Sequence, residues 1–117
     1  MKVAIAQLNY HIGNFEQNTD KIVSKIKEAK KENADLVVFS ELSVCGYPPF
    51  DLLERRSFIE KTIQAVNTIA KECNGIAAIV GAPSLNKGNG KNLFNSAYFL
   101  ENGEIKSITN KTLLPDY

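Results

Sequence analysis

Residues 2–39 decide the fold class, and they read KVAIAQLNYHIGNFEQNTDKIVSKIKEAKKENADLVVF. The stretch opens with an apolar run at 2–8 and closes with another at 36–39, both typical of buried strands. Over residues 14–32 the apolar side chains recur at helical spacing, with charges on the opposite face: Ile22, Val23, Ile26 and Ala29. A strand, a long helix and a second strand predict a right-handed βαβ crossover with parallel pairing.

The ends of the predicted helices and strands carry recognisable local signals. Asn14 is expected to cap the first helix, and Gln17 three residues later completes a capping-box-like pair. Asn74-Gly75 is expected to end a second amphipathic helix over about 56–73. Its apolar stripe is Ile59, Ile63, Val66, Ile69, Ala70 and Cys73.

The remaining residues predict a buried strand, a loop and a hairpin. The strand spans residues 76–81, the loop spans 82–92, and strands at 93–100 and 104–110 flank the two-residue turn Asn102-Gly103. The predicted class is α/β, a mixed sheet with two long helices. Because the chain stops soon after the last strand and leaves a sheet edge open, we expect a domain that is incomplete at its C-terminus.

Composition narrows the class of function. The chain has 117 residues, 44% of them hydrophobic, and a net charge of +1, which argues against a nucleic-acid-binding surface. No stretch resembles a signal peptide or approaches the roughly 20 apolar residues of a membrane helix. The two cysteines make no disulfide framework. We therefore expect a cytoplasmic protein without membrane or nucleic-acid partners.

Glu41 is a candidate catalytic acid or base because of its position. It lies just beyond the predicted buried strand 36–39, and active sites of α/β sheets form at the carboxyl ends of strands. Apolar neighbours would raise the pKa of its carboxyl group toward the range of a general base. The alternative interpretation is a glutamate on a surface loop, which is the commonest place for that residue.

Other reactive side chains are weaker candidates. Lys111 ends the last strand, where a lysine can stabilise an oxyanion, although most lysines at strand ends are solvated. A cysteine–histidine dyad would need Cys45 or Cys73 with His11, and we expect both cysteines to be packing residues. The Gly88–Asn92 loop lacks the features of a phosphate-binding loop and is predicted to be a surface turn.

Two segments together resemble the nitrilase (carbon–nitrogen hydrolase) superfamily. FSELSVCGYP at 39–48 resembles its glutamate signature, and NKTLLPDY at 110–117 resembles its lysine signature. The start of the chain, with VAIAQLN at 3–9, GNF at 13–15 and Asn18, is similar to the first strand and helix of the family. GYPPFDLL at 46–53 is similar to the glutaminase domain of glutamine-dependent NAD synthetases.

This resemblance implies a Glu-Lys-Cys triad that hydrolyses an amide. Glu41 would be the general base and Lys111 the group that stabilises the oxyanion or donates a proton, while Tyr47 and Tyr117 would line a glutamine pocket. No metal or cofactor is implied for these residues. The implied partners are glutamine, the remainder of the domain, a synthetase domain that uses ATP and Mg, and further copies of the chain in a homo-oligomer.

The resemblance also implies what these residues lack. The nucleophilic cysteine of the family follows the lysine motif, and neither Cys45 nor Cys73 matches its position. The family domain is a four-layer α-β-β-α sandwich, of which residues 1–117 would be the first half, predicted to be inactive alone. Three alternatives stay open: another amidase of the omega-amidase type, a non-catalytic interaction module, and a flavodoxin-like binding domain, which the missing phosphate or flavin loop disfavours.

Overall fold

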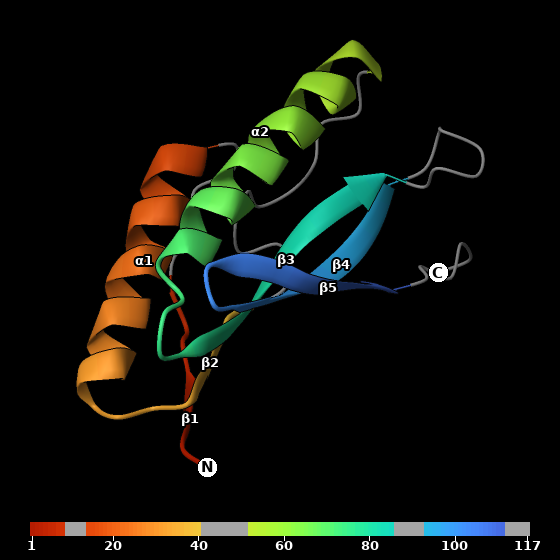
Figure 1. The fold of residues 1–117 in the computed structure, drawn as a ribbon. Coiled ribbons are helices and arrows are strands. Elements are labelled where there is room, and N and C mark those ends of the chain that lie inside the picture. Colours follow the sequence, from red (N-terminus) through yellow and green to blue (C-terminus); the bar gives the residue numbers. More distant parts are fainter. Residues whose placement is uncertain (9–13, 41–51, 86–92, 112–117) are drawn as a thin grey trace.

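The computed structural model describes residues 1–8, 14–40, 52–85 and 93–111 of the chain (Figure 1). Two helices and a five-stranded sheet follow in the order β1 (Val3–Ile5), α1 (Phe15–Lys31), β2 (Leu36–Val38), α2 (Leu52–Lys71), β3 (Ala77–Leu85), β4 (Leu93–Glu101) and β5 (Glu104–Lys111). The strands lie in the sheet in sequence order. The first three pair in parallel, and β3, β4 and β5 pair antiparallel. The predicted α/β class with a mixed sheet is confirmed.

Several element boundaries differ from the predicted ones. Residues 82–85 were expected to be loop, but they extend β3, because Leu85 pairs with Leu93 and the β3–β4 ladder gives their backbone groups partners. Helix α2 begins at Leu52, four residues before the predicted start near 56. Strand β1 is shorter than the apolar run 2–8.

The ends of the elements follow the local signals. The side chain of Asn14 accepts a hydrogen bond of 3.0 Å from the backbone N–H of Gln17, so the predicted N-cap of α1 is confirmed. Helix α2 ends at Lys71, two residues before the predicted end near 73, and Gly75 lies four residues beyond it. Gly75 has φ +79°, a conformation that glycine adopts without steric cost. The predicted hairpin turn has positive φ at both Asn102 and Gly103, as a type I′ turn requires.

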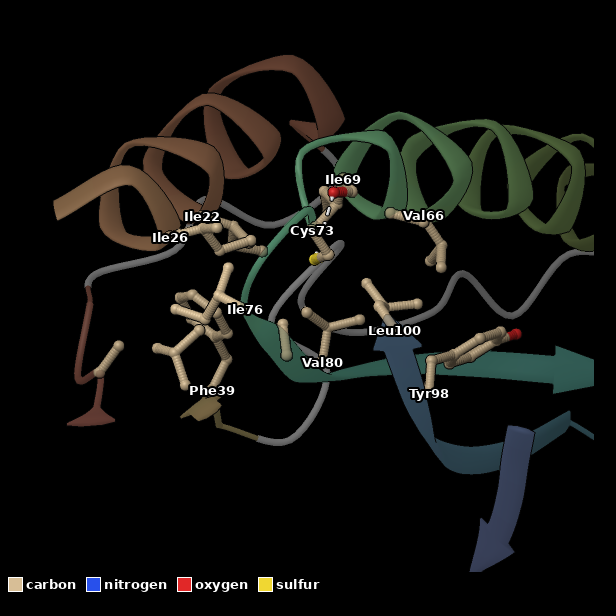
Figure 2. Close-up of a cluster of buried hydrophobic side chains, with 14 of the residues drawn as sticks. Ile22, Ile26, Phe39, Val66, Ile69, Cys73, Ile76, Val80, Tyr98 and Leu100 are labelled. Carbon is tan, nitrogen blue, oxygen red and sulfur yellow. Dashed lines mark hydrogen bonds between the residues drawn. The ribbon is translucent and has the colours of Figure 1, made fainter. Parts of the chain in front are cut away.

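One face of the sheet carries both helices and the hydrophobic core (Figure 2). Ile22 and Ile26 of α1 and Val66 and Ile69 of α2 are fully buried against the strands. The strand residues of this core alternate along β2, β3 and β4: Val37, Phe39, Ala78, Val80, Ala82, Tyr98 and Leu100. One member of the predicted α2 stripe does not belong to the core, because Ile63 is 46% exposed.

The other face of the sheet, here called the open face, is apolar, and neither of the two described helices packs on it. Val3 is 46% exposed and Ile5 is 77% exposed, so the prediction that strand 2–8 is buried was wrong for this face. Their neighbours in register on the same face are partly exposed apolar residues: Leu36, Val38, Ile79 and Phe99. The apolar residues of β1 lie on both faces of the strand, which led to the prediction of a fully buried strand, but α1 and α2 cover only one of these faces.

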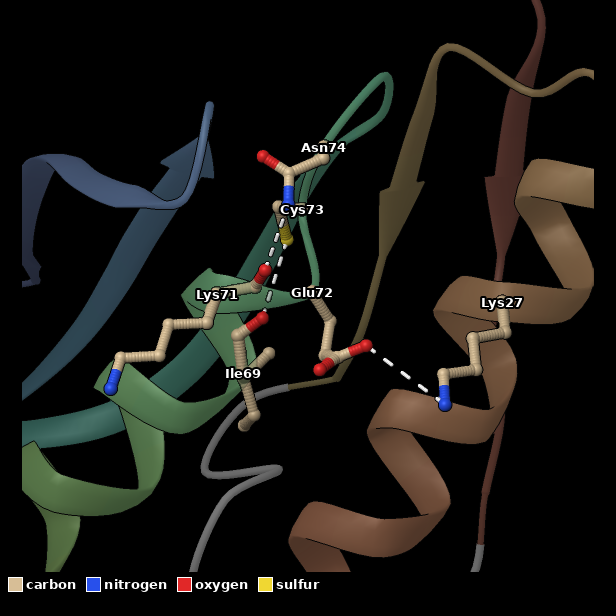
Figure 3. A network of polar contacts seen from close by, with 6 residues as sticks. All are labelled: Lys27, Ile69, Lys71, Glu72, Cys73 and Asn74. Carbon is tan, nitrogen blue, oxygen red and sulfur yellow. Dashed lines mark hydrogen bonds and ion pairs between the residues drawn. The ribbon is translucent and has the colours of Figure 1, made fainter.

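Exposed polar contacts join α1 to the end of α2 and to the start of the chain. Lys27 of α1 lies 3.9 Å from Glu72 at the end of α2 (Figure 3). The Nζ of Lys2 donates to the carbonyl oxygen of Glu32 over 2.7 Å, satisfying a carbonyl group at the end of α1. Neither helix, within the residues described, has the length and apolarity that a membrane crossing requires.

Candidate active site

Strand β2, which precedes Glu41 in the sequence, and strand β5, which contains Lys111, end at the same edge of the sheet. β5 is antiparallel to β4, and β4 is antiparallel to β3, so β5 runs in the same direction as β2 and β3. Two strands lie between β2 and β5, which puts them about 14 Å apart at a spacing of about 4.8 Å per strand. The carboxyl edge of an α/β sheet is where such sites form.

The chain that leads to Glu41 is anchored up to Phe39. The backbone N–H of Phe39 donates to the carbonyl oxygen of Ile79 over 2.9 Å, and the N–H of Ala6 donates to the carbonyl oxygen of Val38 over 2.9 Å. The Phe39 side chain is 5% exposed and packs in the core. The backbone direction is therefore set two residues before Glu41, at the carboxyl end of β2.

Lys111 is the last residue of β5, and its Cα pairs with that of Asn95. Asn95 pairs in turn with Pro83 of β3. On the other side of β3, Val38 of β2 pairs with Ile79, four residues before Pro83. Glu41 follows Val38 by three residues in the sequence, so the two strands lead to the same stretch of the edge. The predicted position of Lys111 at a strand end is confirmed.

Three other predicted site residues lie outside the described part of the chain. They are Glu41 itself, Tyr47 and Tyr117, and the structure describes only the backbone of Lys111. Cys45, His11 and the Gly88–Asn92 loop also lie outside it. Their assigned roles stay predictions.

Cys73 is a core residue, as expected, and is not arranged as a nucleophile (Figure 3). Its side chain is fully buried, and its thiol lies 3.6 Å from the carbonyl oxygen of Ile69, to which it donates. Burial, with a smaller contribution from the charge of Glu72, raises the pKa of the thiol from 9.0 to about 11. A thiol that stays protonated at neutral pH is a poor nucleophile.

Sequence reasoning missed two features of β5, the strand that ends at Lys111. The hydroxyl of Ser96 donates to Oδ1 of Asn110 over 2.8 Å, and Ser96 is only 3% exposed. A β-bulge between Phe99 and Leu100 shifts the register of β5. Neither feature has a local sequence signal, because both depend on which residues of β4 and β5 face each other.

Metal ligation was not predicted for this segment. Within the described ranges, His, Cys, Asp and Glu side chains form no group of three that could hold an ion.

Relatives with assigned functions match the whole chain but are much longer. The glutamine-dependent NAD(+) synthetase of Xanthomonas campestris is 40% identical over 118 residues, covering all of this chain and 21% of the relative. That of Synechocystis is 39% identical over 98% of this chain and 22% of the relative. The chain thus spans about a fifth of the length of these relatives.

Solved structures share the fold. The glutamine-dependent NAD+ synthetase of Acinetobacter baumannii superposes with a TM-score of 0.83 at 37% identity, covering 98% of this chain and 21% of that one. An amidase from Nesterenkonia sp. superposes with a TM-score of 0.78 at 21% identity, covering 97% of this chain and 43% of that one, and shows the fold alone. The carbon–nitrogen hydrolase family model matches residues 2–117. The chain therefore belongs to the carbon–nitrogen hydrolase family.

Proposed function

We propose that residues 1–117 are the N-terminal portion of a glutaminase domain that supplies ammonia to a glutamine-dependent NAD synthetase. The observation that carries the proposal is the common edge at which β2 and β5 end, since Glu41 follows β2 in the sequence and Lys111 is the last residue of β5. Relatives that match the entire chain at 36–40% identity are glutamine-dependent NAD(+) synthetases, which favours glutamine among possible amides.

The proposed chemistry uses a cysteine supplied from outside residues 1–117. Glu41 takes the proton of the cysteine thiol, and the thiolate attacks the side-chain amide carbon of glutamine. Lys111 stabilises the oxyanion of the tetrahedral intermediate. The carbon–nitrogen bond then breaks, ammonia leaves with the proton returned by Glu41, and water hydrolyses the resulting thioester to glutamate.

The remaining roles concern the substrate pocket and the longer protein. Tyr47 and Tyr117 would line the glutamine pocket, a role that the family resemblance supports. A synthetase domain elsewhere in the protein would use ATP and Mg to amidate nicotinic acid adenine dinucleotide with the released ammonia. We expect the full-length enzyme to be cytoplasmic and homo-oligomeric.

The open face of the sheet supports the proposal that the domain continues beyond these residues. Val3, Ile5, Ile79 and Phe99 form an apolar layer that the two helices leave without cover. An apolar strand pattern on both faces is typical of a sheet packed on both sides. The remainder of the same domain, contributing the second sheet of a four-layer sandwich, is the occupant we propose.

The test compares two nitrogen donors in the full-length protein. Glu41→Gln and Lys111→Met should each lower glutamine-dependent NAD formation by at least about 100-fold, since each removes a group that acts in the transition state. NAD formation from added ammonium should stay within twofold of the unmodified protein. Glutamine-dependent activity that survives Glu41→Gln would contradict the assignment of the base.

Two of the alternatives predict different results in the same assay. An amidase of the omega-amidase type would hydrolyse other small amides faster than glutamine and would not couple hydrolysis to NAD formation. A non-catalytic module would hydrolyse no amide in the full-length protein, and neither substitution would change the rate of NAD formation.

A further inference from the structure

The hydrogen bond between Ser96 and Asn110 ties the end of β5 to β4 directly before Lys111. The Ser96 hydroxyl is buried at 3% exposure and donates to Asn110 Oδ1 over 2.8 Å. The two residues are also partners in the β4–β5 register. Because alternate residues of a strand point to opposite faces, this pair belongs to the helix-covered face together with Tyr98 and Leu100.

The β-bulge determines which residue of β5 pairs with Ser96. Next to the turn, Glu101 pairs with Glu104 and Leu100 with Ile105. A regular ladder continued from there would pair Phe94 with Lys111. The observed ladder instead skips Lys106, so that every later residue of β5 is displaced by one position.

A one-residue displacement exchanges the two faces of the strand. In the observed register the backbone of Asn110 pairs with that of Ser96, and the backbone of Lys111 pairs with that of Asn95, whose position in the ladder belongs to the open face. In the regular register Asn110 would face Asn95, and residue 111 would hold a position on the helix-covered face. The Ser96–Asn110 hydrogen bond forms only in the bulged register.

We propose that Ser96 and Asn110 are positioning residues that hold Lys111 at the register position that the glutaminase reaction needs. The inference rests on the proposed function of Lys111. A bulge redirects the side chains of the residues that follow it, and here a part-buried hydrogen bond ties the strand end beyond the bulge to β4. Neither Ser96 nor Asn110 touches the substrate in this proposal.

The test uses full-length protein and separates kcat from KM for glutamine hydrolysis. Ser96→Ala and Asn110→Ala should each lower kcat by roughly 10- to 100-fold, because small misplacements of a catalytic group have effects of that size. KM for glutamine should stay within threefold, which shows that the glutaminase domain is folded. Ammonium-dependent NAD formation should stay within twofold, which shows that the synthetase domain is intact. The Ser96→Ala/Asn110→Ala double variant should lose less than the product of the two single losses, since both substitutions remove the same hydrogen bond.

Two further variants serve as controls. Ser96→Thr keeps the hydroxyl and should retain at least half of the kcat of the unmodified protein. Thr68→Ala removes a hydroxyl that donates to Gln64 on the exposed side of α2, and should leave kcat unchanged.

The possible failures are distinguishable. If Lys111→Ala abolishes glutamine hydrolysis while Ser96→Ala and Asn110→Ala keep kcat within twofold, the positioning role is overturned. Losses that multiply in the double variant would also overturn it, because they would show two independent effects. If Lys111→Ala itself retains full glutaminase activity, the proposed function fails instead.

Discussion

Truncating Ile5 tests whether the open face is covered in the full-length protein. Ile5 lies in β1 and is 77% exposed in the described structure, so only about a quarter of its side chain is buried. Complete burial of an isoleucine side chain contributes roughly 1.5–3 kcal/mol. Without further cover, Ile5→Ala should therefore lower the free energy of unfolding by only about 0.5 kcal/mol.

A covered face gives a much larger expected loss. If a second sheet packs on β1, Ile5→Ala removes buried methyl groups and leaves a cavity, and such core truncations cost about 2–5 kcal/mol. Ile22→Ala is the internal reference for this range, since Ile22 of α1 is fully buried already. Ile63→Ala on α2 is the matched surface control, because Ile63 is 46% exposed and lies away from the open face.

Native-state hydrogen exchange of the full-length protein provides the assay. The amide of Ala6, which donates to Val38 over 2.9 Å, reports the local stability of β1. We expect Ile5→Ala to accelerate its exchange roughly 100-fold, corresponding to about 2.8 kcal/mol. Acceleration of no more than about threefold, as expected for a solvated side chain, would refute the reasoning that the open face packs against the rest of the domain.

Three further predictions concern the helix ends and the buried thiol. Gly75→Ala should lower the free energy of unfolding by about 1 kcal/mol in urea titrations, because φ +79° is strained for a residue with Cβ. Asn14→Ala should cost about 1 kcal/mol in the same titration, since it removes the bond that caps α1, whereas Asn14→Asp should retain it. Cys73 should resist iodoacetamide at pH 8 in the native protein and react on unfolding. Since the pKa of its thiol is raised from 9.0 to about 11 in the folded state, stability should be unaffected below pH 9 and fall as pH rises toward 11. A Cys73→Ala variant that shows the same alkaline loss would contradict this explanation.

The candidate site was predictable to the extent that it depends on local sequence. The apolar run 36–39 and the hairpin around Asn102-Gly103 put Glu41 and Lys111 just after or at strand ends without any tertiary information. Their common edge required the directions of all the strands between them. The one-residue register shift at Lys106 had no sequence signal, because the position of a bulge depends on which residues of β4 and β5 pair along the whole ladder.

The sequence by itself determined the α/β class, the order of the elements and the start of α1. The class and the order follow from the periodicity of apolar residues. The local conformations at Asn14 and Gly75 follow from the capping side chain of Asn14 and from the absence of a Cβ in glycine, and both depend only on residues close by in the sequence. Only the tertiary structure decided that Ile5 and Ile63 are exposed and that Asn110 meets Ser96. The physical reason is that burial and register are properties of pairs of segments: an apolar pattern states that a side chain favours burial, whereas the neighbouring element determines whether it is buried.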